Sequence, residues 1–147
     1  MRSLSSLAAV VLTAALLPTA GAATIEVKML NRGPHAAMAF EPEFLQVAPG
    51  DTVKFLATSS GHNAATITGM TPANAVPFKG KINEEIAVTL NENGLYGIEC
   101  LPHYAMGMVM LIQVGETPLS SLHIPADVPD AAKQRFQAIV DRASKAQ

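Results

Sequence analysis

The chain has 147 residues, of which 49% are hydrophobic and only 15% are charged. Its 10 Lys and Arg are outnumbered by 12 Asp and Glu, which gives a formal net charge of −2 with neutral histidines. Nucleic-acid binding normally requires a basic patch, so this balance argues against it. The length suits a single domain with one hydrophobic core.

The first 22 residues have the pattern of a secretory signal peptide. Arg2 supplies positive charge, residues 7–17 form an apolar run, and Ala20-Gly21-Ala22 provides the small residues that precede a cleavage site. A membrane span needs about 20 apolar residues, so the short run favours a cleaved signal over an uncleaved anchor. We expect cleavage after Ala22 and an exported domain of residues 23–147 that has no membrane attachment.

The exported part alternates short strand-like segments with turn signals. Residues 24–30 alternate apolar and polar side chains, as a half-buried strand does. Pro49-Gly50 fits the middle of a type II turn, because glycine takes the positive φ there without penalty. Residues 91–94 suggest a hairpin between the two strands that flank them. The expected strands are residues 24–30, 44–47, 52–58, 64–68, 85–90, 95–100 and 109–114.

After Gly115 the pattern changes to that of an amphipathic helix. Apolar side chains fall on one helical stripe, and Pro129 or Asp130 provides a start. We expect one helix over about residues 130–143, whose role is to cover a sheet edge or face. Many short strands separated by closely spaced turns are typical of a β-sandwich. The expected fold is therefore mainly β, with a C-terminal helix.

Three kinds of metal donor occur within nine residues of the chain. Residues 100–108 read Cys-Leu-Pro-His-Tyr-Ala-Met-Gly-Met, and His62 lies well upstream between two strands. A thiolate and two imidazoles in a plane, with a weak axial thioether, are typical ligands of copper that transfers one electron. The cysteine is the only one in the chain, so no disulfide can protect it. Metal ligation would protect it.

Each residue near the cysteine also has a simpler role. A free cysteine is often a small core residue, but Cys100 and His103 stand three residues apart in a loop stiffened by Pro102. Because Pro102 has no N–H, it removes one hydrogen-bond donor to the thiolate, and we expect it to moderate the reduction potential. Asn63 follows His62 and offers an amide that can tie the two ligand loops together.

The remaining ligand positions are less sharply defined by the sequence. His62 is the best second imidazole, because His35 and His123 lie in less suitable places. Met106 and Met108 compete for the axial position, since Gly107 between them lets the backbone turn tightly. Their spacing alone does not separate these two methionines.

Several stretches of the sequence have counterparts in one known family: residues 25–31, 49–55, 61–63, 81–84 and 100–108. With these stretches the chain resembles the cupredoxins, and within them the pseudoazurin group, over nearly all of residues 23–147. The resemblance implies a Greek-key β-sandwich and one type 1 copper ion. It implies the ligands His62, Cys100, His103 and axial Met108, and it places Met38 close to the second histidine.

The resemblance also implies a periplasmic electron carrier that transfers single electrons between larger redox proteins. Such partners include a copper nitrite reductase and a c-type cytochrome, and a carrier that docks through its copper face is most simply a monomer. Pseudoazurins typically surround that face with lysines, whereas Ser60 and Glu99 stand here at two such positions. The remaining docking candidates are Lys28, Arg32, Lys79, Lys81 and the apolar Met106.

Other kinds of protein use similar donors. A copper nitrite reductase or multicopper oxidase needs a second copper with further histidines, and only His35 and His123 remain, in separate loops. A copper-delivery or storage module exposes Met and His clusters, whereas a closed set of four donors favours retention. A thioether is a poor zinc ligand. The sequence therefore predicts an electron-transfer protein and not an enzyme.

Overall fold

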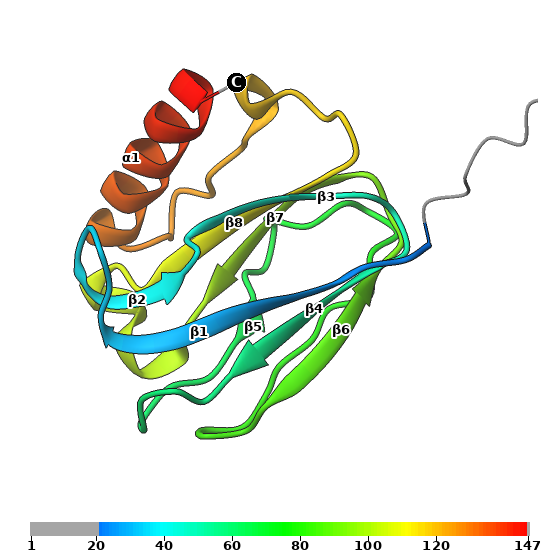
Figure 1. Ribbon diagram of the computed structural model, residues 1–147. Helices are drawn as coiled ribbons and strands as arrows, with labels where there is room; N and C mark the ends of the chain where they lie inside the picture. The colour runs from blue at the N-terminus through cyan, green and yellow to red at the C-terminus, as the bar shows by residue number, and fades with distance from the viewer. Residues whose placement is uncertain (1–20, 147) are drawn as a thin grey trace, which may run out of the picture.

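The computed structural model describes residues 21–146 of the chain. The predicted signal peptide lies outside the described residues, except for its last two positions. Two four-stranded sheets pack face to face, with a helix along one side (Figure 1). Among the described residues, no helix is both long and apolar enough to cross a membrane.

The two sheets contain all eight strands of the described chain. One sheet has the order β2-β1-β4-β6, formed by Ala37–Glu41, Thr24–Arg32, Asp51–Leu56 and Ile86–Leu90. The other has the order β3-β8-β7-β5, formed by Phe44–Val47, Val109–Val114, Gly94–Glu99 and Ala65–Thr66. The helices are η1 (Leu101–Met106), η2 (Leu119–Ser121) and α1 (Asp130–Ala146). The predicted Greek-key sandwich with a C-terminal helix is confirmed.

Strand β8 is apolar except for Gln113 because it is buried on both faces. Met108, just before the strand, and Met110 face the core between the two sheets. Val109 and Leu111 face the other way, toward a second cluster that contains Phe136 of α1. Successive side chains of a strand point to opposite faces, so a strand between two clusters loses its polar alternation. The helix therefore covers the outer face of this sheet.

The hairpin predicted around residues 91–94 is wrong. Strand β6 pairs with β4 in one sheet, whereas β7 pairs with β8 in the other, so this turn carries the chain across the sandwich. The Tyr96 hydroxyl donates a hydrogen bond of 2.9 Å to the carbonyl of Glu92 and so holds this corner. Turn residues mark a change of direction, but they do not specify which strand the next segment pairs with.

The first sheet differs from the prediction in two further places. Strand β1 continues to Arg32, two residues beyond the predicted end at residue 30. Strand β2 was not predicted; it has only 5 residues, and Met38 within it has a positive φ of 50°. It pairs only with β1 and forms an edge of the sheet.

The predicted turn at Pro49-Gly50 is present, and its geometry fixes a carboxylate. Gly50 has a φ of 93°, and the Asp51 N–H donates to the Ala48 carbonyl at 3.1 Å. The Asp51 carboxylate in turn accepts the N–H groups of Ala23 at 2.8 Å and of Ala48 at 2.9 Å. These bonds hold the pKa of Asp51 below its ordinary value of 3.8, although partial burial opposes them.

This arrangement predicts an acid-sensitive contribution to stability. A carboxyl whose pKa is lowered on folding stabilises the fold above its unfolded pKa, and the contribution disappears as the pH falls through the folded pKa. We expect Asp51→Asn to lower the free energy of unfolding at neutral pH, with a smaller deficit at about pH 3. Urea unfolding of both proteins at the two pH values measures this. An equal loss of unfolding free energy at both pH values would contradict the explanation based on the Asp51 charge.

Candidate metal centre

Two loops at one end of the sandwich carry the predicted ligands. His62 lies in the loop between β4 and β5, and Cys100 is the first residue after β7. The 3₁₀ helix η1 begins next, with Pro102 in its first turn, and contains His103. Since proline lacks an N–H, it suits the start of a helix, where that group would have no partner. Short connections from β7 and into β8 thus fix both ends of this loop.

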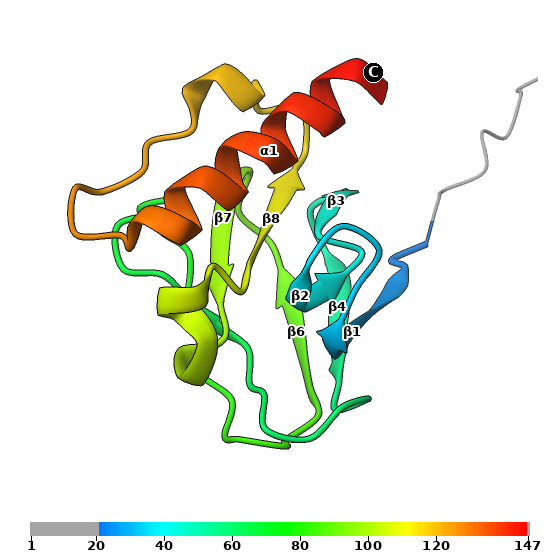
Figure 2. The same cartoon turned by 90° about the vertical axis from the view of Figure 1, so that its left-hand side faces the viewer.

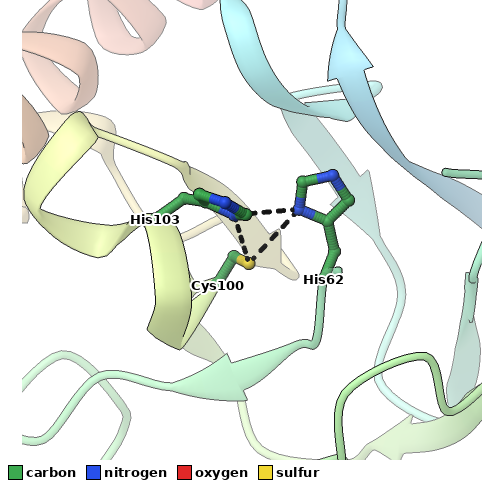
Figure 3. Close-up of side chains that lie close together, drawn as sticks. All are labelled: His62, Cys100 and His103. Carbon is green, nitrogen blue, oxygen red and sulfur yellow. Dashed lines mark hydrogen bonds between the residues drawn. The ribbon is translucent and has the colours of Figure 1, made fainter. Parts of the chain in front are cut away.

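Three donor atoms converge between these loops (Figure 3). The Nδ1 atoms of His62 and His103 are 3.1 Å apart, and the Cys100 Sγ lies 3.6 Å from each of them. A point equidistant from all three lies about 2.0 Å away from each, and metal–nitrogen and metal–thiolate bonds are about 2.0–2.3 Å long. A trigonal S,N,N set of this size fits a type 1 copper ion.

His62 is held in place from behind by a residue that the sequence did not single out. Its Nε2–H donates to the Asn31 Oδ1 at 2.8 Å, which leaves Nδ1 directed at the other donors. Burial lowers the pKa of His62, and the nearby His103 lowers it further, so the neutral form able to bind metal is favoured. Such a bond fixes the tautomer and orientation of a ligand ring.

Cys100 is fully buried beside the two histidines. Burial raises the pKa of its thiol, while backbone N–H groups of Asn63 and His103 partly oppose this by stabilising the thiolate. Without metal the sulfur therefore keeps its proton more firmly than an exposed thiol does. A bound cation would displace that proton and hold the thiolate.

Asn63 connects the two ligand loops. The Leu101 N–H donates to the Asn63 Oδ1 at 2.8 Å, and the Asn63 side-chain amide donates to the Gly80 carbonyl at 2.9 Å. Because Asn63 is buried, both bonds are shielded from water. The first bond holds the loop that bears His62 against the loop that begins at Cys100, and the second ties the His62 loop to the segment before β6.

The structure distinguishes the two methionines that the spacing left open. Met108 is fully buried in the core cluster that includes Cys100. Its N–H donates to the His103 carbonyl and its carbonyl accepts the Cys100 N–H, at 3.1 and 3.0 Å. Met106, by contrast, is 57% exposed. Burial and backbone contacts therefore favour Met108 as the axial donor.

The other residues singled out in the sequence differ in burial. Met38 is half-buried against the same core cluster as Cys100, and its approach to the second histidine stays a prediction. Four candidate docking cations are exposed: Lys28, Arg32, Lys79 and Lys81.

The charge of one of these cations is partly balanced. Burial raises the pKa of the Glu99 carboxyl, and the nearby Lys79 lowers it. Glu99 thus reduces the positive charge next to the ligand loop.

Helix α1 supports the metal-binding loop directly. Figure 2 shows η1 beneath the first turns of α1. Gly107, which ends η1, has a φ of 86°, and a Cβ there would lie 2.8 Å from the Ala131 carbonyl oxygen. Only glycine allows both the left-handed backbone and this close approach. The helix was expected only to cover the sheet, and its first turn also fixes the loop between His103 and Met108.

This contact predicts a specific effect of Gly107→Ala. The positive φ and the overlap with Ala131 together should lower the free energy of unfolding by about 2–4 kcal/mol and displace the copper loop. Gly50→Ala is the matched control, since Gly50 also has a positive φ but has open space around its Cβ position. Urea unfolding and the visible spectrum of the copper-loaded proteins measure both effects. If both variants lost the same unfolding free energy and kept the visible spectrum of the unaltered protein, the helix contact would not be what holds the loop.

A Greek-key sandwich that brings one thiolate, two imidazoles and a buried thioether together at one end defines a blue-copper protein of the cupredoxin class. The sequence comparison agrees, because residues 27–115 match the model of "copper binding proteins, plastocyanin/azurin family". The chain belongs to this family, and within it to the pseudoazurins.

The relatives that place it there are similar over most of their length. A pseudoazurin from Paracoccus pantotrophus is 44% identical over 92% of this chain and 93% of its own. A solved Sinorhizobium pseudoazurin has a TM-score of 0.78 and 40% identity, over 85% of this chain and 99% of its own. The solved pseudoazurin from Methylobacterium extorquens AM1 has a TM-score of 0.75 and 36% identity, over 82% of this chain and 98% of its own.

Proposed function

We propose that this protein is an exported, periplasmic one-electron carrier. The observation that carries the proposal is the trigonal set of His62, Cys100 and His103, whose donor atoms lie 3.1–3.6 Å apart. Copper held there would supply the one-electron couple. We assign the equatorial ligands to these three residues and the axial position to Met108. No substrate is bound or transformed in such a process, so the protein is not an enzyme.

The chain itself keeps the donors in one arrangement. Asn31 orients His62, and Asn63 ties the His62 loop to the start of the Cys100 loop. The Gly107–Ala131 contact closes the other end of that loop. A site whose ligands move little between two oxidation states needs little reorganisation when an electron enters or leaves. The hydrogen bonds and packing contacts described above provide this rigidity.

His103 is the natural route for the electron. His62 is fully buried, whereas His103 is half-buried in η1, next to exposed apolar side chains. Leu101 is 41% exposed and Met106 is 57% exposed. A small apolar surface of this kind suits brief docking with a larger redox protein. We propose that a copper nitrite reductase or a c-type cytochrome docks here and that the carrier acts as a monomer.

The visible and electron paramagnetic resonance spectra of the copper-loaded protein test the proposed function. We expect an intense thiolate-to-copper band that bleaches on reduction and returns on reoxidation, with narrow copper hyperfine splitting. A pale spectrum with ordinary splitting would mean that Cys100 is not a ligand. In that case a copper-delivery or storage function would replace the carrier.

A further inference from the structure

A basic groove lies beside the copper loop, between helix α1 and the edge strand β2. One hollow of about 330 Å³ is lined by Met106 together with Gln134, Arg135 and Arg142. A second, more apolar hollow of about 310 Å³ includes Phe40 and Phe44. The two hollows share His35, Ala36 and Arg142, so they adjoin each other beside the helix, and together they are called the groove. In Figures 1 and 2 this helix passes beside the β1–β2 connection.

The groove has an excess of positive charge at the end nearest the copper loop. Arg142 is already paired, since its Nη2 and Nε lie 2.6 and 2.7 Å from the Glu43 Oε1. Arg135 has no carboxylate within ion-pair distance among residues 21–146. Among the acidic residues, Glu41 and Glu43 line only the apolar hollow. An acidic group is therefore best accommodated next to Arg135.

Arg135 is held in a way that leaves it ready to bind an anion. Its guanidinium donates to the carbonyl oxygens of Met38 and Ala37, each at 3.4 Å. Bonds of this length to neutral oxygens are weak, whereas a guanidinium binds a carboxylate in two short, charge-assisted bonds. The two β2 carbonyls fix the side chain along the edge strand without neutralising its charge.

The position of the groove connects it to electron transfer. Met106 lines the basic hollow and belongs to the same short helix as His103. A protein segment seated along α1 would therefore touch the copper loop. We propose that this groove docks an acidic segment of the redox partner, with its carboxylates at Arg135 and an apolar side chain toward Phe40 and Phe44. This inference rests on the proposed carrier function and names the chemistry of the partner.

Charge complementarity with Arg135 favours an acidic occupant for this groove. Charges of opposite sign steer the encounter and fix its orientation more than they raise affinity. The lysine ring expected of pseudoazurins is reduced here at Ser60 and Glu99. The arginine groove offers a cationic surface on the α1 side of the copper loop instead.

A peptide titration tests the groove independently of electron transfer. The probe is acetyl-Glu-Glu-Glu-Phe-amide, added to the ¹⁵N-labelled Cu(I) protein and followed by NMR. We expect shifts at Ala36, Met106 and the Arg135 Nε, and none of them with acetyl-Lys-Lys-Lys-Phe-amide. Chemical-shift changes that cluster instead around Lys79 and Lys81, or no changes at all, would contradict the proposal that the groove binds acidic segments.

A matched pair of variants gives the second readout. Gln134→Glu adds one negative charge inside the basic hollow, and Ser144→Glu adds the same charge on exposed α1 surface outside it. We expect Gln134→Glu to weaken peptide binding at least about fivefold, while Ser144→Glu leaves it unchanged. Equal weakening would mean that only net charge matters, and the groove assignment would fail.

The groove and the carrier function can fail separately. Cyclic voltammetry of the same proteins reports whether the copper accepts and releases one electron reversibly. Irreversible copper chemistry would overturn the carrier, and with it the redox role of the groove, even if the peptide binds. A reversible copper couple without selective peptide binding would overturn the groove and leave the carrier function intact.

Discussion

Replacing Cys100 with Ser is expected to abolish the thiolate-to-copper absorption and the reversible redox couple while preserving the fold. The Cys100 Sγ stands 3.6 Å from each of the two histidine Nδ1 atoms and is the only thiol in the chain. A hydroxyl is not ionised at neutral pH, so it cannot replace the thiolate that makes copper binding strong and coloured. Retaining one polar atom at that position avoids a cavity.

The fold should tolerate the change because the hydroxyl has partners. His62 and His103 both present ring nitrogens to this position, so the buried oxygen can form a hydrogen bond. We expect the metal-free variant to lose no more than about 1–2 kcal/mol of unfolding free energy. Visible absorption, voltammetry and urea unfolding of the metal-free protein measure the three effects.

A histidine outside the donor set provides the control for this experiment. His123 does not belong to the group of converging donors, so His123→Ala should keep both the colour and the redox couple. Reversible electron transfer that persists in Cys100→Ser would remove Cys100 from the ligand set. Loss of colour in His123→Ala would show that the spectrum responds to something other than the proposed ligands.

The sequence predicted those features of the fold that depend on neighbouring residues. Strand β8 was recognised from a mostly apolar run, and the turn at Gly50 from a Pro-Gly pair. The donors of the copper loop could be recognised because Cys100 and His103 lie close together in the chain. Helix α1 was predicted from its apolar stripe and begins at Asp130 as expected, although it continues to Ala146.

The sequence did not reveal features that depend on contacts between distant segments. Asn31 holds His62 across 31 residues of sequence, and its position near a Gly-Pro pair indicated only the end of a strand. The β6–β7 turn has the residues of a hairpin, yet each flanking strand pairs with a partner elsewhere. Pairing is decided by which faces are buried, and a turn sequence alone does not specify that.

The contacts of helix α1 that concern function were likewise not predictable from its local sequence. Its apolar stripe predicted that it would cover a sheet, and it does pack on the outer face of β8. Nothing local in the sequence indicated that Ala131 would lie against Gly107, or that Arg135 would reach the β2 carbonyls. Both contacts arise because the chain returns to the copper end of the sandwich after β8. One helix thus both stabilises the copper loop and lines the proposed docking groove.

The axial position gives the second large expected effect, and a pair of variants isolates it. Met108→Leu should raise the reduction potential and alter the charge-transfer spectrum, because it removes the thioether donor that favours the oxidised metal. Leu has nearly the volume of Met, so the loss of unfolding free energy should stay below about 1.5 kcal/mol. Spectroelectrochemistry of the copper-loaded protein measures the potential and the spectrum together.

Met106→Leu makes the same chemical change two residues away, in a side chain that is 57% exposed instead of buried. We expect its spectrum and potential to match those of the unaltered protein, because Met106 lines the surface groove and does not lie in the core cluster with Cys100. A shift of the potential in Met106→Leu with none in Met108→Leu would reverse the axial assignment. The spacing of the two methionines leaves this choice open, so burial of the Met108 side chain is the physical basis of the prediction.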